Sequence, residues 1–228
     1  MKIGGLQKLS LLDFPDKTAC IVFTKGCNFR CPFCHNASLV VGNETFSSEE
    51  EVFSVLKKRK GLLDGVVITG GEPLIHADIA DLIIRIREEG YAVKLDTNGT
   101  FPDRLGALIE QKLVDYVAMD IKNSPARYAE TIGVENFDLA PVKKSVELLK
   151  EGKVDYEFRT TVVKPYFDEK SFEGIGEWIK GANRYYLQNY KDSGEVISPE
   201  NCSAYSEEEM QKFLSIILPF VPSAKIRG

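Results

Sequence analysis

Three cysteines close together in the chain are the residues best suited to chemistry. Cys27, Cys31 and Cys34 follow one another at intervals of four and three residues. A loop of this size can wrap three thiolates around one small iron–sulfur cluster. A cubane of four irons takes four ligands, so three cysteines leave one iron open. An open metal position is where a bound molecule can react.

Other interpretations of the same residues remain open at this point. Cys31, Cys34 and His35 fit the C-x-x-C-H pattern of haem attachment, and the two cysteines alone fit a redox pair, but both leave Cys27 unexplained. Haem attachment also requires export, and residues 1–18 lack the apolar core of a signal peptide. A zinc site of the three cysteines with His35 is a third alternative, although Cys34 and His35 are adjacent and point awkwardly for one tetrahedron. Three unrelated cysteines are the fourth.

The composition is that of a globular protein. The chain has 228 residues, 43% of them hydrophobic, and a formal net charge of −5. We expect a single domain over residues 1–228, with a core at about 18–190 and a C-terminal loop and helix at 191–228. The charge gives no basic field for nucleic acid, and no apolar run approaches the ~20 residues of a membrane span. Five cysteines, an odd number, predict a reduced, cytoplasmic protein rather than a disulfide framework, with Cys202 as a free thiol.

Short apolar runs alternate with amphipathic segments along the chain. They predict strands at residues 19–24, 66–69, 91–95, 116–119, 156–163 and 184–187, with 224–226 as a candidate for one more. Residues 1–17 are assigned to turns. Helices are expected between successive strands, and Ser48 and Ser206 are placed where two of them begin. Six strands alternating with helices indicate parallel βα units, which right-handed crossovers curl into an α/β fold, a partial parallel (β/α)6 barrel.

The unusual motifs all follow predicted strands. In parallel α/β folds, ligands gather at the carboxyl ends of the strands. The motifs are the cysteine loop, Gly70-Gly71-Glu72-Pro73, Asp96-Thr97-Asn98-Gly99, Asp120-Ile121-Lys122, Arg159 and Gln188. Their convergence on one edge predicts a single site.

With these motifs in place, the sequence resembles the radical S-adenosylmethionine superfamily. The cysteine spacing, with the aromatic Phe33 before the third cysteine, is highly specific, and the resemblance extends from about Ser10 to Gln188. Cys34-His35-Asn36 and Asp96-Thr97-Asn98-Gly99 narrow it to the activases of glycyl-radical enzymes.

A further segment resembles one group of these activases. Leu11-Leu12-Asp13-Phe14-Pro15 looks like the activating proteins of anaerobic ribonucleoside-triphosphate reductase, in their longer form. The resemblance implies an oxidoreductase whose partners are a large glycyl-radical enzyme subunit and a flavodoxin- or ferredoxin-type electron donor. The expected reaction reductively cleaves S-adenosylmethionine to methionine and a 5′-deoxyadenosyl radical, which takes hydrogen from a glycine of the partner.

The resemblance also implies a role for each site residue. Cys27, Cys31 and Cys34 would hold a [4Fe–4S] cluster whose open iron is chelated by S-adenosylmethionine. Gly70, Gly71 and Glu72 would bind the amino group of the methionine part, because glycine lets the backbone approach and a carboxylate suits an ammonium. Phe33 would lie against the adenine, with ordinary core packing as its alternative.

The remaining cofactor contacts come from later strands. Asp96, Thr97 and Asp120 would line the S-adenosylmethionine site, with a monovalent cation as a further candidate ligand. Lys122 and Arg159 are candidates for the ribose and carboxylate, or for structural ion pairs. Gln188 stands where pyruvate formate-lyase activase has a histidine, a departure that leaves its role open.

Three classes of function compete on this sequence. The first is an activase that makes a radical on a glycine of a partner enzyme. That partner is anaerobic ribonucleoside-triphosphate reductase, pyruvate formate-lyase or another glycyl-radical enzyme. The second is a radical enzyme acting on a small molecule, such as a deazapurine synthase. The third is a non-catalytic metal-binding module. The motifs around Cys34 and Asp96 favour the first over the second, and the third leaves the motifs at the strand ends unexplained.

Overall fold

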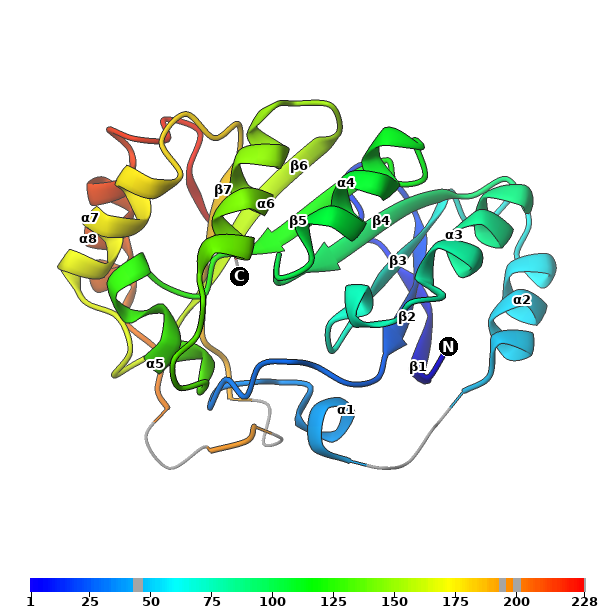
Figure 1. Ribbon diagram of the computed structural model, residues 1–228, viewed down its shortest axis with the longest axis horizontal. Helices are drawn as coiled ribbons and strands as arrows, with labels where there is room; N and C mark the ends of the chain where they lie inside the picture. Colours follow the sequence, from blue (N-terminus) through cyan, green and yellow to red (C-terminus); the bar gives the residue numbers. More distant parts are fainter. Residues whose placement is uncertain (43–46, 193–195, 199–201, 228) are drawn as a thin grey trace.

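The strands form one curled sheet in chain order. The computed structural model describes residues 1–42, 47–192, 196–198 and 202–227. Within these ranges eight strands are hydrogen-bonded in the order β1 to β8. β1 runs antiparallel to β2, and each later pair of neighbours is parallel. Figure 1 shows the helices on the outside of the curled sheet.

The bounds of the elements are as follows. The strands are β1 (Ile3–Ser10), β2 (Ala19–Thr24), β3 (Gly65–Gly70), β4 (Ala92–Thr97), β5 (Tyr116–Asp120), β6 (Asp155–Val162), β7 (Tyr185–Asn189) and β8 (Lys225–Arg227). The α-helices are α1 (Ala37–Val41), α2 (Glu49–Lys58), α3 (Ile79–Glu88), α4 (Pro102–Glu110), α5 (Tyr128–Ile132), α6 (Ala140–Lys150), α7 (Glu169–Trp178) and α8 (Glu207–Ile217). Two short 3₁₀ turns lie at Pro73–Ile75 and Pro125–Arg127.

The predicted partial (β/α)6 barrel is confirmed. The six expected parallel strands are β2 to β7, and β8 adds a short parallel strand beside β7. Their ends agree with the prediction to within two residues. The helices are built as their sequences indicate. In α3, for example, the residues at helical spacing, Ile79, Leu82, Ile83 and Ile86, are all buried against the sheet.

One local prediction is wrong. The assignment of residues 1–17 to turns fails because Ile3–Ser10 form β1, an edge strand. Its Gly4-Gly5 pair and two irregularities in its register with β2 hide the alternation that marks a strand. β7 extends two residues past the expected end of the sixth strand. Gln188 pairs with Thr161 of β6 and Arg227 of β8, and Asn189 pairs with Val162 of β6.

The inner face of the curled sheet changes character along its length. Residues two apart on a strand face the same way, so Tyr116 and Asp120 on β5 share this face. Toward the amino ends of the strands, Phe14 packs with Ile21, Val67 and Tyr116 in a small apolar cluster. Toward the carboxyl ends the same face carries charged side chains. The polar site therefore lies at the carboxyl ends of the strands, and the small apolar cluster lies toward their amino ends on the same face of the sheet.

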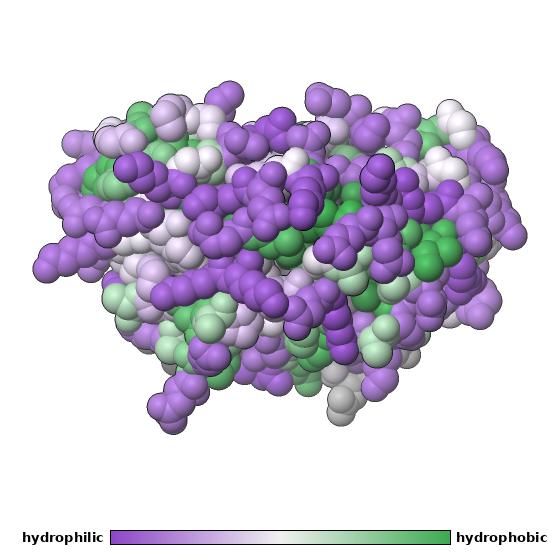
Figure 2. Space-filling view, turned by 45° about the horizontal axis from the view of Figure 1, so that its top comes forward, coloured by the Kyte–Doolittle hydropathy of each residue, from purple (hydrophilic) through white to green (hydrophobic). Residues whose placement is uncertain are grey.

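The outer surface is mostly polar. Figure 2 shows one face on which hydrophilic residues dominate and hydrophobic ones appear in small areas between them. Among the helices of the described ranges, none has the length and apolar character needed to cross a membrane.

Candidate active site

A cavity of about 520 Å³ lies at the carboxyl ends of the strands. In Figure 1 the loop that follows β2 crosses the lower part of the view, below these strand ends. Most of the residues that the sequence assigned to the site line this cavity: Cys27, Cys31, Phe33, Cys34, Gly70, Gly71, Asp96, Thr97, Asp120, Lys122, Arg159 and Gln188. Glu72 is the exception.

The cysteine loop is held from both sides. The backbone N–H of Arg30 donates to the carbonyl of Ile132 at 2.8 Å, and Nε2 of His76 lies 2.7 Å from the carbonyl oxygen of Lys25. Cys31 is buried, and burial raises the pKa of its thiol to about 12. Burial also raises the pKa of Cys27. A cationic ligand, such as a metal centre, would stabilise the thiolates of Cys27 and Cys31.

The two glycines after β3 let that turn touch the cysteine loop. Gly70 has a φ of +110°, which favours glycine. A Cβ on Gly71 would lie 2.0 Å from the carbonyl oxygen of Gly26. Both glycines line the cavity, and the side-chain amide of Asn36 donates to the Gly70 carbonyl at 3.0 Å. Only a turn without side chains brings the backbone this close to the loop.

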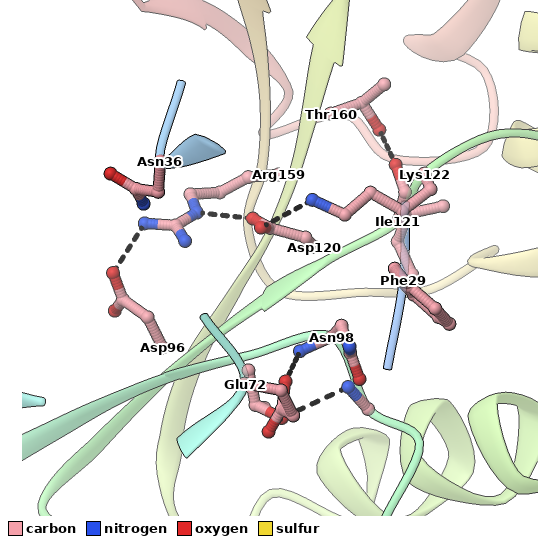
Figure 3. A network of polar contacts seen from close by, with 12 residues as sticks. Phe29, Asn36, Glu72, Asp96, Asn98, Asp120, Ile121, Lys122, Arg159 and Thr160 are labelled. Carbon is pink, nitrogen blue, oxygen red and sulfur yellow. Dashed lines mark hydrogen bonds and ion pairs between the residues drawn. The ribbon is translucent and has the colours of Figure 1, made fainter. Parts of the chain in front are cut away.

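Glu72 is not among the residues that line the cavity, and its predicted contact with the amino group of the cofactor stays a prediction. Its side chain is fully buried. One carboxylate oxygen accepts hydrogen bonds from the Leu74 N–H at 3.0 Å and the Thr97 hydroxyl at 2.8 Å, and the other accepts from the Asn98 N–H at 2.7 Å. Figure 3 shows Glu72 beside Asn98. Burial is the largest influence on its pKa and raises it to about 7 against these hydrogen bonds. In this geometry Glu72 ties the turn after β3 to the loop after β4.

A row of charged side chains at the carboxyl ends of β4, β5 and β6 forms one wall of the cavity (Figure 3). Arg159 donates from Nη1 to Asp96 at 3.2 Å and from Nε to Asp120 at 3.0 Å, and Lys122 donates to Asp120 at 3.0 Å. Burial raises the pKa of Asp120, but the charges of Arg159 and Lys122 lower it by more, so Asp120 is ionised. Arg159 and Lys122 thus form the ion pairs that were one of their two expected roles. Both also line the cavity, and contact with the cofactor's ribose or carboxylate stays a prediction.

Comparison with known proteins decides the family. The model of the radical SAM superfamily matches residues 21–179, which is more than half of the chain. The chain belongs to the radical SAM superfamily.

Individual relatives refine this assignment. A Methanocaldococcus jannaschii protein named as a glycyl-radical enzyme activating enzyme is 35% identical over 194 residues, 83% of this chain and 80% of that protein. The pyruvate formate-lyase-activating enzyme of Listeria monocytogenes is 30% identical over 134 residues, 53% of each chain. The chain is therefore an enzyme of the glycyl-radical activating class.

A solved structure supports the fold. Streptococcus suis SuiB, in a crystal structure bound to S-adenosylmethionine, shares the fold with a TM-score of 0.69. The match covers 91% of this chain and 52% of that one, at 15% identity. At this identity the comparison establishes a common architecture and nothing about individual residues.

The residues of the radical SAM site fit the cofactors of the superfamily. Radical SAM enzymes use a [4Fe–4S] cluster and S-adenosylmethionine. Three cysteines on one cavity wall suit a cubane with an open iron. The cavity volume is in the range of small-molecule sites, and the cationic side chains suit a ligand carboxylate. Phe33 is buried, and its ring centroid lies 5.7 Å from that of Tyr166. It offers an aromatic surface to this cavity.

The zinc alternative gains no support from the geometry. Over the described ranges, no three His, Cys, Asp or Glu side chains converge on a position that could hold a single ion. His35 instead stacks on Tyr190, with ring centroids 5.3 Å apart. A cubane makes no such demand, because each cysteine binds a different iron.

Sequence reasoning missed several residues of the cavity wall. Arg227, from the last strand, lines the cavity and makes a bidentate ion pair with Glu157, at 2.7 and 3.0 Å. No local pattern marks it, because the curl of the sheet alone brings β8 to the site. Asn98 belonged to a motif that was noticed, but its part in holding Glu72 was not foreseen. Lys94 is not among the residues that line the cavity, but it is buried and paired with Asp96. Its only signal in the sequence is that it is a lysine within an apolar strand.

Proposed function

We propose that this enzyme abstracts a hydrogen atom from a glycine of a glycyl-radical enzyme, and that the partner is an anaerobic ribonucleoside-triphosphate reductase. The observation that carries the proposal is that three cysteines, a glycine turn and a cationic wall line one cavity, in a chain 35% identical to a glycyl-radical enzyme activating enzyme. A [4Fe–4S] cluster with S-adenosylmethionine would supply a 5′-deoxyadenosyl radical in this cavity.

The protein's own residues would bind and orient these groups. Cys27, Cys31 and Cys34 would hold the cluster, and Gly70 and Gly71 would leave room for the methionine part of the cofactor. Asp96, Thr97, Asp120, Lys122, Arg159 and Gln188 would line the rest of the site, and Phe33 would pack against the adenine. Closing these groups in a cavity keeps water from the reactive species.

The segment that resembles reductase activases supports a protein substrate. Asp13 lines the cavity, and its neighbours Leu11 and Leu12 are 68% and 91% exposed. Exposed apolar side chains beside a site are typical of a protein-binding surface, and a small-molecule substrate would have no use for them. We further propose a cytoplasmic location and a flavodoxin- or ferredoxin-type electron donor, for which the exposed Arg30 within the cysteine loop is a suitable contact.

The test follows the hydrogen atom. The reduced, cluster-loaded protein is mixed anaerobically with S-adenosylmethionine and a ribonucleoside-triphosphate reductase subunit deuterated at glycine Cα. The carbon–deuterium bond breaks, and we expect deuterium in 5′-deoxyadenosine and a glycine-centred electron paramagnetic resonance signal. The same signal on pyruvate formate-lyase alone would reassign the partner. Turnover of a carboxy-tetrahydropterin without any glycine signal would instead support a deazapurine synthase.

A further inference from the structure

A buried lysine stands behind the charged wall of the cavity. Lys94 lies on β4 two residues before Asp96, so both side chains are on the inner face of the sheet. Its side chain is 2% exposed, and its Nζ lies 2.5 Å from Oδ1 of Asp96. Burying an ammonium group is costly unless it is paired. The pairing with Asp96 is therefore a built feature of the strand.

Every carboxylate oxygen of the wall has a partner from the chain itself. Asp96 accepts from Lys94 at Oδ1 and from Arg159 at Oδ2. Asp120 accepts from Arg159 at Oδ1 and from Lys122 at Oδ2. Figure 3 shows Arg159 lying between the two aspartates. Lys94, Lys122 and Arg159 thus face Asp96 and Asp120, and Arg227 is paired with Glu157, which leaves one positive charge among these seven side chains.

This arrangement conflicts with the monovalent cation that the family resemblance suggested. Such an ion takes oxygen ligands, of which carboxylates are the strongest. Here a cation would compete with the ammonium and guanidinium groups already bound to these oxygens and would add charge to a wall that is already positive. We propose that Lys94 is a positioning residue which, together with Arg159, takes the place of a monovalent cation at Asp96 and Asp120. S-adenosylmethionine then binds to this protein without added Na⁺ or K⁺.

The first test uses the unaltered protein. Binding of S-adenosylmethionine to the cluster-loaded full chain is measured by anaerobic titration calorimetry in the chlorides of tetramethylammonium, sodium and potassium at equal ionic strength. We expect the three dissociation constants to agree within about twofold. Binding that is about tenfold tighter in sodium or potassium would overturn the proposal. Because the readout is binding alone, its outcome does not depend on which partner the enzyme activates.

The second test removes the internal cation. Lys94→Met keeps a long apolar side chain and loses the charge, so Oδ1 of Asp96 becomes available. In tetramethylammonium we expect binding of S-adenosylmethionine to weaken about tenfold, and sodium or potassium to restore it. A loss that neither ion restores, or no loss at all, contradicts the proposal.

A matched control removes an ion pair of similar length at the surface. Lys144 lies 2.6 Å from Asp103, and the two side chains are 66% and 88% exposed. Lys144→Met should bind S-adenosylmethionine as the unaltered protein does in all three salts. Iron content and near-ultraviolet circular dichroism show whether each variant is folded. If Lys94→Met does not hold its cluster, the salt comparison on the unaltered protein decides the question.

Discussion

The contact between the glycine turn and the cysteine loop can be tested by adding a single methyl group. In Gly71→Ala the new Cβ would lie 2.0 Å from the carbonyl oxygen of Gly26 and 2.7 Å from its carbonyl carbon. Both are backbone atoms, so neither can rotate away. The turn and the loop must therefore separate by roughly 1 Å or more to reach ordinary contact.

The cost of this separation can be worked from the contacts involved. Overpacking of this kind costs about 1–3 kcal/mol. The separation also strains the hydrogen bond from the Glu72 N–H to the Gly26 carbonyl, now 2.8 Å, which contributes about 1 kcal/mol. We expect a loss of about 3 kcal/mol in the free energy of unfolding, equivalent to about 6–12 °C in Tm for a chain of this size, with weaker binding of S-adenosylmethionine.

The control for this prediction is the same substitution in an open place. A Cβ on Gly106, within α4, meets only Cδ2 of Leu148 at 3.6 Å. Gly106→Ala should stabilise the protein by about 0.5–1 kcal/mol, because alanine is the better helix former. Both variants are measured by denaturant unfolding of the cluster-free protein and by calorimetric titration of the loaded one. A Gly71→Ala variant as stable as the unaltered protein, with unchanged binding, would refute the proposed contact.

Three further predictions concern the cluster, the buried carboxylate and the charged wall. Alanine at any of the three loop cysteines should abolish iron binding after anaerobic reconstitution, whereas the Cys202→Ala variant should retain about four irons per chain. Iron analysis of each variant checks this prediction. Stoichiometric zinc in anaerobically purified protein would contradict it. The pKa of Glu72 is raised from 4.5 to about 7, so the folded state holds this proton more tightly and its contribution to stability is lost as pH rises from about 4.5 through about 7. Denaturant unfolding across that range should show the decline, and Glu72→Gln should flatten it; an unaltered slope in the variant argues against this origin. Arg159→Met should cost about 2–3 kcal/mol of unfolding free energy, since it takes a charged partner from two carboxylates whose side chains are only 13% and 30% exposed. Arg184→Met, whose pair with Asp155 is largely exposed, should cost less than about 1 kcal/mol. Equal losses would mean that the wall is not a coupled network.

The sequence predicted the fold well because the relevant signals are local. Each parallel strand buries both faces and reads as a short apolar run, and each helix shows its period in the spacing of apolar residues. The sequence did not predict β1, because an edge strand pairs on one side only and glycines interrupt the alternation of its residues. The predicted sixth strand ended before Gln188 for a related reason, since the pairing of Gln188 with Arg227 of β8 depends on a segment far along the chain.

The sequence by itself determined the chemistry of the cysteine loop and of the glycine turn, because both are fixed by spacing within a few residues. Only the tertiary structure decided where the charged side chains point. It placed the buried Glu72 carboxylate against Thr97 and Asn98, and it paired the buried Lys94 with Asp96. These pairings depend on strand register and on the curl of the sheet, which set the distances between residues on different strands. No pattern along a single strand contains that information.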